Sequence, residues 1–310
     1  LGMTVITHIG TYLPENRASN LALLEKFETD ENFIQDKIGV VQRAVKTPEQ
    51  KASDLCIKAF ENLMTKIDLD IEQVDCCVVV TQNPDINIPH TSAIVHGALN
   101  LPETCASFDI SLGCSGYVYG LSIVSAFMQA NGFKTSLLFT ADPYSDIIDP
   151  DDKNTALIFG DGATVTLLQA EQPGMAALGY DFGSKGAGYK NLMVNKGKLF
   201  MNGRAVFSFT AAVVPKSIEK LLKNLNLDKN EVDQWYFHQG SKYIIDTITM
   251  RLGLEPEKVV FNMYDYGNTV SSSIPMLLSE SLPKFKVGQK IGLSGFGVGL
   301  SWASVIFEIK

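Results

Sequence analysis

The sequence predicts an α/β fold with a mainly parallel central sheet. Segments of strand length, such as the continuous apolar run 76–81 and the strand-like run 136–141, alternate along the chain with segments of helical pattern, which is typical of a sheet covered by helices on both faces. The order of strands and helices then repeats in the second half of the chain. We therefore expect two similar halves, 3–172 and 173–310, that divide at the polar Pro-Gly segment 171–174.

The elements of the first half are predicted from apolar periodicity. Residues 5–12 alternate like a strand, and Asn20 is placed to cap a helix over 21–27. A second helix at 30–38 is expected to stop at Gly39. The other predicted elements are an amphipathic helix after Ser53, a strand at 76–81, a helix at 91–99, a buried strand at 108–112, a helix from Cys114 to about residue 130, and strands at 136–141 and 163–169.

The second half carries the same two kinds of signal. Apolar residues at helical spacing alternate with short buried runs of strand length. The predicted helices lie at 207–225, 241–252 and 271–281, and the predicted strands at 235–237, 259–261, 290–294 and 302–309.

Composition and charge exclude several classes of function. A chain of 310 residues with 45% hydrophobic residues can bury a large core. Its formal net charge of −8 argues against a general nucleic-acid binder. There is no apolar run long enough to span a membrane and no secretory signal pattern, so we expect a cytoplasmic protein. The five cysteines form no C-x-x-C pair, and we expect reduced thiols and no metal site.

Cys114 lies in a turn between a predicted strand and a predicted apolar helix. The sequence there, from Phe108 to Leu121, places the cysteine at the helix start between Gly113 and Gly116. Free N–H groups and the helix dipole favour a thiolate at such a position, so Cys114 is a candidate nucleophile. The alternative at this point is a core cysteine in a strand-to-helix turn.

Three further candidates follow predicted strands or turns in the second half. His238 comes directly after the strand 235–237, at the end where open α/β sheets bind ligands. Asn268 precedes the helix at 271–281 and offers an uncharged donor. The glycines in 295–299 let backbone N–H groups approach a ligand oxygen. Taken singly, these residues could instead be a core histidine, a helix cap and a tight hairpin.

Together the candidates resemble the β-ketoacyl-acyl-carrier-protein synthase III family of the thiolase superfamily. The resemblance covers nearly the whole chain. It implies a thiolase-like five-layered αβαβα fold of two pseudo-duplicated halves and a homodimer. The motifs that carry it are Gly113-Cys114-Ser115-Gly116, His238-Gln239, Gly267-Asn268-Thr269 and Gly295-Phe296-Gly297.

The chemistry implied by the resemblance is acyl transfer followed by decarboxylative Claisen condensation. Cys114 would accept an acyl group from a thioester, with the oxyanion held by the N–H groups of Cys114 and Val298. A malonyl thioester would then lose carbon dioxide while His238 and Asn268 hold the enolate, and attack on the acyl-cysteine would give a β-ketoacyl thioester. The implied partners are coenzyme A thioesters or acyl carrier protein, and no cofactor or metal is required.

Several positions depart from the family pattern. Phe33 and Lys153 stand where family members that use coenzyme A often hold adenine between a tryptophan and an arginine, and with Lys37 and Ser241 they form the expected coenzyme A or carrier site. Phe296 and Ile88 are the expected acyl-pocket residues. Ile88 replaces a phenylalanine that closes this pocket from the partner subunit in short-chain enzymes, which predicts a primer longer or bulkier than acetyl.

Two other functions stay open on the sequence. The departures favour a specialised ketosynthase or acyltransferase of secondary metabolism. A non-catalytic partner subunit of an active homologue is the alternative outside the enzyme class, and the intact set of Cys114, His238 and Asn268 argues against it. A hydroxymethylglutaryl-type synthase needs a glutamate after the strand 78–81, where Gln82 stands.

Overall fold

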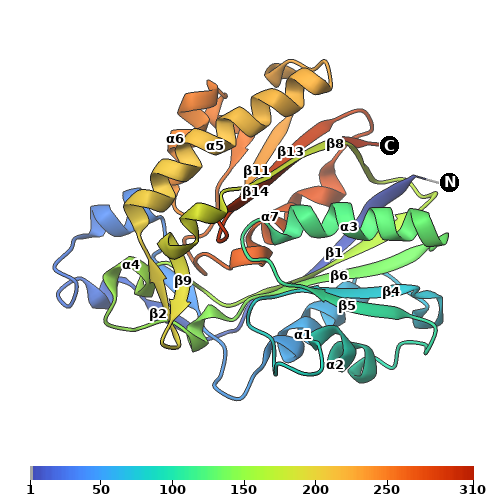
Figure 1. The fold of residues 1–310 in the computed structure, drawn as a ribbon, viewed down its shortest axis with the longest axis horizontal. Helices are drawn as coiled ribbons and strands as arrows, with labels where there is room; N and C mark the ends of the chain where they lie inside the picture. The colour runs from blue at the N-terminus through green and yellow to red at the C-terminus, as the bar shows by residue number, and fades with distance from the viewer. Residues whose placement is uncertain (1–2) are drawn as a thin grey trace.

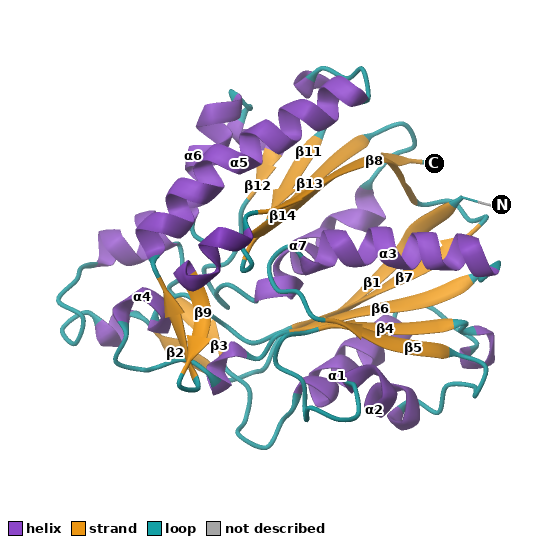
Figure 2. Cartoon of the chain, viewed as in Figure 1, coloured by secondary structure: helices purple, strands orange, loops and turns teal. Residues whose placement is uncertain are grey.

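Five layers of alternating helices and strands make up the structure, a computed structural model that describes residues 3–310 (Figure 1). Two helices cover each outer face of the sheet, and two more lie between its halves (Figure 2). The outer helices are α1 (Ala52–Met64) and α2 (Thr91–Ala98) on the first half, and α5 (Gly203–Asn224) and α6 (Lys242–Leu252) on the second. The central helices are α3 (Gly116–Asn131) and α7 (Ser273–Ser281). The predicted five-layered α/β fold is confirmed.

Ten strands form the main sheet in the order β12-β11-β13-β14-β8-β1-β7-β6-β4-β5. The strands of the first half are β1 (Thr4–Tyr12), β4 (Cys76–Val80), β5 (Ala106–Ile110), β6 (Thr135–Ala141) and β7 (Ala163–Ala170). Those of the second half are β8 (Met175–Ser184), β11 (Gln234–Phe237), β12 (Val259–Val260), β13 (Lys290–Gly297) and β14 (Ser301–Ile309).

The two halves of the sheet share one topology. In each, the strands lie in the order third, second, fourth, fifth and first along the chain. In each half, the second strand pairs in parallel with the third and the fourth. The fifth strand pairs antiparallel with the fourth and the first. A short antiparallel pairing of β1 with β8 joins the halves. The division of the chain into domains at 172/173 falls between β7 and β8 and stays a prediction.

Helix α3 anchors the nucleophile turn in the core. Its residues Tyr117, Val118, Leu121 and Val124 are buried against apolar side chains from both halves of the sheet. A helix with apolar residues around most of its surface belongs in such a central layer. The start of α3 is therefore fixed between the two halves, next to the end of β13.

A smaller group of elements flanks one side of the molecule, at the left of Figure 1. Two hairpin-like pairs lie there with a short helix. They are β2 (Arg17–Ser19) paired with β3 (Gln42–Ala44), β9 (Leu192–Asn195) paired with β10 (Lys198–Met201), and α4 (Lys153–Ala156).

The predicted helix at 21–27 is wrong. Only a 3-10 turn at Leu21–Leu23 forms, and Asn20 does not cap it. Instead the buried Asn20 amide donates to the carbonyl oxygens of Val40 at 2.9 Å and Leu157 at 2.7 Å. The side chain satisfies distant backbone groups, a role that local sequence does not reveal.

The strand expected at 108–112 lies at 106–110 and is not fully buried. It forms β5 at the edge of the sheet, where most of its residues are half-buried. The sequence interpretation missed β8 and the β9–β10 pair.

Candidate active site

The turn between β5 and α3 holds Cys114 inside the protein. Gly116 N–H donates to Gly113 O at 2.8 Å, which closes the turn. Backbone hydrogen bonds from Val298 and from Cys114 itself reach the thiol. The loop at Val298 is tied to the same turn, because Ser301 Oγ donates to Val298 O at 2.8 Å and lies 2.7 Å from Ser115 Oγ.

The end of β13 lies directly against the cysteine. A Cβ atom added at Gly297 would be 2.8 Å from Cys114 Sγ, and one added at Gly295 would be 2.7 Å from Cys114 O. No side chain fits at such distances. The sequence suggested that these glycines follow a strand, but they lie within β13. Their lack of a side chain lets β13 contact the turn that holds Cys114.

Burial governs the ionisation of Cys114. It raises the pKa of the thiol to about 12, and the nearby Asp142 carboxylate adds to this effect. The hydrogen bonds from Val298 and Cys114 act in the opposite direction and are outweighed. The expectation that this position favours a thiolate is therefore wrong, since desolvation opposes the charged form.

His238 follows β11 and is buried. Its Nδ1 lies 2.7 Å from Ser273 Oγ, at the start of α7. Burial lowers the pKa of His238 to about 3, although a backbone hydrogen bond with Val270 opposes the shift. Its ring meets Phe296 edge-on, with ring centroids 5.5 Å apart. The imidazole is therefore neutral across the physiological range.

Asn268 is held by backbone contacts on both sides. Its N–H donates to Ile158 O at 2.8 Å, and its O accepts from Gly160 N–H at 2.9 Å. Its side-chain Oδ1 accepts from Val270 N–H at 2.8 Å. Val270 has a φ of 58°, a left-handed conformation that is strained for a β-branched residue. This strained turn directs the Asn268 amide nitrogen toward His238, 3.5 Å from Nε2.

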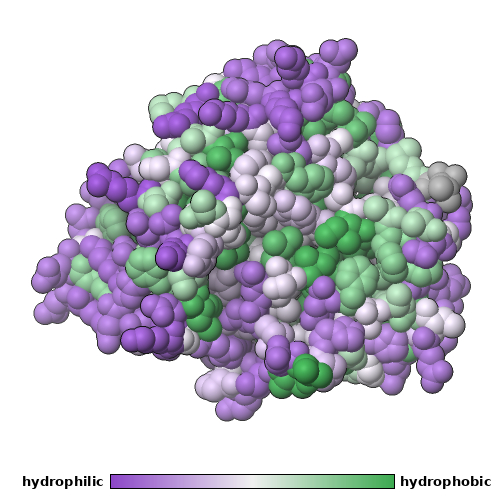
Figure 3. Space-filling model, viewed as in Figure 1, coloured by the Kyte–Doolittle hydropathy of each residue, from purple (hydrophilic) through white to green (hydrophobic). Residues whose placement is uncertain are grey.

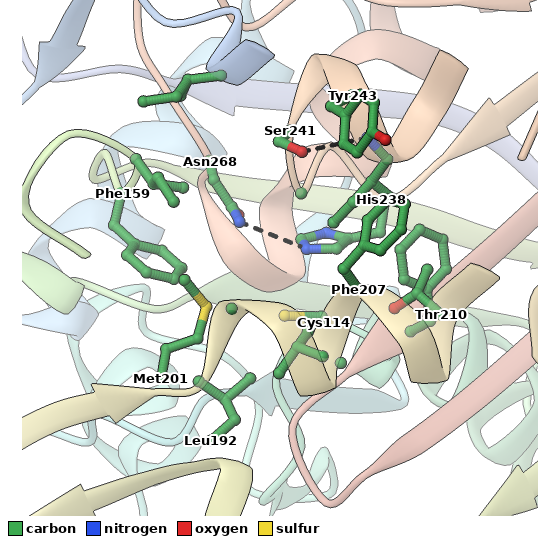
Figure 4. A pocket seen from close by; sticks show the side chains of 18 of the residues that line it. Cys114, Phe159, Leu192, Met201, Phe207, Thr210, His238, Ser241, Tyr243 and Asn268 are labelled. Carbon is green, nitrogen blue, oxygen red and sulfur yellow. Dashed lines mark hydrogen bonds between the residues drawn. The ribbon is translucent and has the colours of Figure 1, made fainter. Parts of the chain in front are cut away.

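One pocket of about 400 Å³ brings these residues together (Figure 4). Cys114, His238, Asn268 and Phe296 all line it. Figure 4 shows Phe159, Met201 and Leu192 on one side of Cys114, and Phe207 and Thr210 on the other.

Most residues predicted for the coenzyme A or carrier site lie at the pocket entrance. Phe33, Lys37 and Ser241 line the pocket. Lys37 Nζ lies 4.4 Å from the ring centre of Tyr243, and Lys153 Nζ lies 4.8 Å from that of Phe33. Ser241 also caps α6 by accepting from Ile244 N–H at 3.2 Å.

Three of the predicted site residues, Ile88, Lys153 and Val298, do not line this pocket. Ile88 is 82% exposed. The sequence analysis assigned it to the pocket of a partner subunit, and that assignment stays a prediction.

Three residues near the site have roles that the sequence did not suggest. Ser273 supports His238, and Asp142 lies buried near Cys114, where it accepts from Gln82 N–H and Ser271 Oγ. Thr210 lines the pocket from α5. A signal existed for Asp142, which directly follows the buried strand β6 just as His238 follows β11. There was no signal for Thr210 in the sequence, because it lies within a helix whose pattern indicates only core packing.

The described residues offer two further observations. Between residues 3 and 310, no group of three or more His, Cys, Asp or Glu side chains could hold a metal ion. No helix in that same range is long and apolar enough to cross a membrane.

The layered fold and this pocket define a condensing enzyme of the thiolase fold. Two family profiles match the chain: 3-oxoacyl-[acyl-carrier-protein (ACP)] synthase III over residues 108–186, and 3-oxoacyl-[acyl-carrier-protein (ACP)] synthase III C terminal over residues 222–309. The chain belongs to the β-ketoacyl-[acyl-carrier-protein] synthase III family, which confirms the resemblance seen in the sequence.

Individual members of this family align with nearly the full length of the chain. The β-ketoacyl-[acyl-carrier-protein] synthase III of Caldanaerobacter subterraneus is 33% identical, covering 96% of each chain. That of Lactococcus lactis is 34% identical, covering 98% of each chain. The crystal structure of the synthase III from Thermus thermophilus is 30% identical and superposes with a TM-score of 0.92, covering 99% of each chain.

Proposed function

We propose that the protein transfers an acyl group from a thioester to Cys114 and condenses it with a malonyl thioester to form a β-ketoacyl thioester. One observation carries the proposal. Cys114, His238 and Asn268 come from three separate segments of the chain and line a single pocket. A thiol and two uncharged nitrogen donors are the groups that this reaction needs.

In the first step, Cys114 Sγ attacks the carbonyl carbon of the acyl donor. As the carbonyl oxygen gains negative charge, we infer that it accepts from the N–H groups of Cys114 and Val298. The carbon–sulfur bond of the donor then breaks, and the donor thiol leaves with the proton that Cys114 carried. Because burial raises the pKa of Cys114 to about 12, the thiol is protonated before the attack and its proton must be transferred during this step.

In the second step, the malonyl carboxylate leaves as carbon dioxide and its electron pair forms an enolate. Gln239 N–H donates to Ser273 Oγ at 3.3 Å, which leaves the Ser273 hydroxyl proton free to donate to His238 Nδ1. The ring proton is then on Nε2, beside the Asn268 amide nitrogen. Both nitrogens donate to the enolate oxygen.

Carbon–carbon bond formation completes the reaction. The enolate carbon attacks the acyl carbonyl carbon, and the bond from that carbon to Cys114 Sγ breaks. The released thiolate takes one proton from solvent. This proton balances the overall reaction, since carbon dioxide leaves uncharged.

We infer that the acyl donor is coenzyme A or acyl carrier protein, and that its arm enters past Phe33, Lys37, Lys153 and Ser241. The lysines offer cations for phosphate groups. The Phe33 ring offers a surface for a base, and Lys153 Nζ lies over the same ring.

We also infer a homodimer. Strand β5 leaves one edge of the sheet unpaired, and such an edge invites pairing with another chain. Figure 3 shows apolar residues gathered right of centre, on the side where Figure 1 places α3. Ile123 of α3 and Phe182 of β8 are exposed, and Phe127 of α3 is half-buried. A second copy would cover this face and bring its Ile88 toward the acyl pocket. Light scattering should give twice the chain mass, and a monomer at micromolar concentration would contradict the inference.

The five cysteines are all free thiols. This suits a reducing compartment, and we infer a cytoplasmic location.

The test of the proposed function is to trap the acyl-enzyme. The protein is incubated with a panel of acyl-coenzyme A and acyl-carrier thioesters and weighed intact by mass spectrometry, with Cys114→Ala as the control. One acyl mass on the wild type and none on Cys114→Ala is the expected result. No acylation by any donor would remove the first step.

A further inference from the structure

Thr210 places an unpartnered hydroxyl in the wall of the pocket. The residue lies on α5, is 1% exposed and lines the pocket with Phe207. Its Oγ1 is buried without a hydrogen-bond partner among the described residues. A buried hydroxyl normally has a partner, and the exceptions call for an explanation.

Both threonines of the neighbouring helix α6 satisfy their hydroxyls locally, whereas Thr91 in the first turn of α2 does not. On the neighbouring α6, Thr247 Oγ1 donates to Tyr243 O at 2.8 Å, and Thr249 Oγ1 donates to Ile245 O at 2.7 Å. This bond to the carbonyl four residues back is the usual solution in a helix. Thr210 does not make the equivalent bond to Val206. Its hydroxyl is therefore left for a partner from outside the chain.

The position of Thr210 tells which part of a substrate it meets. Phe207, three residues earlier on α5, stacks on the exposed Tyr243 at the entrance, with ring centroids 4.9 Å apart. Three residues of helix advance about 4.5 Å, so Thr210 lies one step further inward from the entrance. In Figure 4 it lies on the opposite side of Cys114 from the apolar residues Phe159 and Leu192. An arm that enters past Tyr243 and Phe207 toward Cys114 would therefore pass Thr210 on this side of the pocket.

We propose that the Thr210 hydroxyl hydrogen-bonds the amide nearest the thioester in a pantetheine arm. This inference rests on the proposed function, which supplies the thioester. In a pantetheine arm that amide is two methylene groups from the sulfur, on the entrance side. A hydroxyl suits it because it donates to the amide carbonyl or accepts from the amide N–H. Thr210 thus distinguishes pantetheine-type thioesters from simple alkyl thioesters.

The test compares two substrates and two variants. The substrates are one acyl group carried either on N-acetylcysteamine, which has the amide, or on pentanethiol, which does not. Thr210→Val keeps the shape and removes the hydroxyl, whereas Thr210→Ser keeps the hydroxyl. The rate of Cys114 acylation is followed by intact mass. Thr247→Val is the matched control, since its hydroxyl bonds its own helix outside the pocket.

We expect Thr210→Val to slow acylation by the N-acetylcysteamine thioester about three- to tenfold and to leave the pentanethiol ester unchanged. Thr210→Ser should stay within about twofold of wild type for the amide substrate, and Thr247→Val should not discriminate between the substrates. The melting temperature of Thr210→Val should equal or exceed that of wild type, because no bond within the protein is lost.

Three results would overturn the inference. Equal slowing of both substrates would assign Thr210 to packing. No slowing of either would show that its hydroxyl does not meet the arm. If wild type is acylated by neither these thioesters nor coenzyme A and carrier thioesters, the proposed function fails and this inference fails with it. The first two results leave the proposed function intact.

Discussion

Asn268 Nδ2 and His238 Nε2 lie 3.5 Å apart in the pocket wall. Each nitrogen is fixed from behind, the amide by Val270 N–H on Oδ1 and the imidazole by Ser273 on Nδ1. Two donors at this separation can reach a single oxygen atom. Neither group carries a charge, because burial lowers the pKa of His238 to about 3. The pair is therefore suited to stabilise a negative oxygen that forms during a reaction.

Alkylation of Cys114 by iodoacetamide should accelerate with pH without a plateau. Burial and Asp142 raise the pKa of the thiol to about 12, so the thiolate fraction grows about tenfold per pH unit between pH 6 and 9. Asp142→Asn should react faster at each pH, because it removes a negative charge that raises this pKa. The measurement is the labelling rate by mass, with Cys114→Ala as the blank. A plateau above pH 7 would contradict the raised pKa.

His238→Ala should separate the two steps of the reaction. The acyl-enzyme still forms, because Cys114 and the backbone donors are intact. Condensation falls about 10²- to 10³-fold, the cost of losing one donor at a developing oxyanion. Ser273→Ala should show a smaller loss in the same step. Both steps are measured by mass, as acyl-enzyme and as product. Equal loss of both steps in His238→Ala would show that His238 also serves acylation.

Asn268→Asp tests the donor role of the amide. The carboxylate keeps the shape and the bond from Val270 N–H to Oδ1, but it replaces the donor by an acceptor. Condensation should fall at least as far as in Asn268→Ala, since the new oxygen repels the enolate. If Asn268→Asp retains more activity than Asn268→Ala, Asn268 acts by shape and not by donation.

Gly297→Ala should abolish acylation of Cys114. The new Cβ atom would lie 2.8 Å from Sγ, so the sulfur or the strand must shift. Such overpacking costs about 1–3 kcal/mol of stability, and displacement of the nucleophile costs activity. Gly97→Ala is the matched control, because nothing lies within 4 Å of its Cβ. It should keep full activity and gain up to about 1 kcal/mol as a helical alanine. A normal acylation rate in Gly297→Ala would mean that β13 is not fixed against Cys114.

Asp142 should make the protein less stable as pH rises from about 4 to 6. Burial raises the pKa of this carboxyl from 3.8 to about 6, so the folded state favours the protonated form. Ionisation then costs the folded state about 3 kcal/mol above pH 6, and this penalty is absent below the unfolded pKa. The penalty is measured as the difference in free energy of unfolding between wild type and Asp142→Asn, by urea unfolding from pH 4 to 7. Parallel stability curves for the two proteins would exclude the raised pKa.

The sequence predicted most of the fold because its core elements carry strong local patterns. The continuous apolar run 76–80 forms a strand buried on both faces, and α3 ends at Gly132 in the left-handed conformation as its Asn-Gly signal indicates. Strand β8 was missed because its burial alternates weakly and glycines interrupt it. The helix predicted after Asn20 was wrong because asparagine often caps a helix, whereas this side chain donates to backbone carbonyl groups far along the chain.

The sequence predicted the site residues that follow strands or turns. It did not predict the properties that depend on burial in the folded protein. Cys114 lies in the turn between β5 and α3 and His238 directly follows β11, and the pocket does bring both together with Asn268. Desolvation is a property of the folded surroundings, so the raised pKa of Cys114 could not be predicted from a helix start. Thr210 gave no signal either, because an unsatisfied hydroxyl is recognised only when its neighbours are known.

Product formation from a trapped acyl-enzyme is the decisive test of condensation on Cys114. The acyl-enzyme is formed on Cys114, separated from excess donor and mixed with a malonyl thioester. We expect the acyl mass to leave the protein while carbon dioxide and a β-ketoacyl thioester lengthened by two carbons appear together. Release of the acyl group as a free acid or onto another acceptor, with no new carbon–carbon bond, would contradict this expectation.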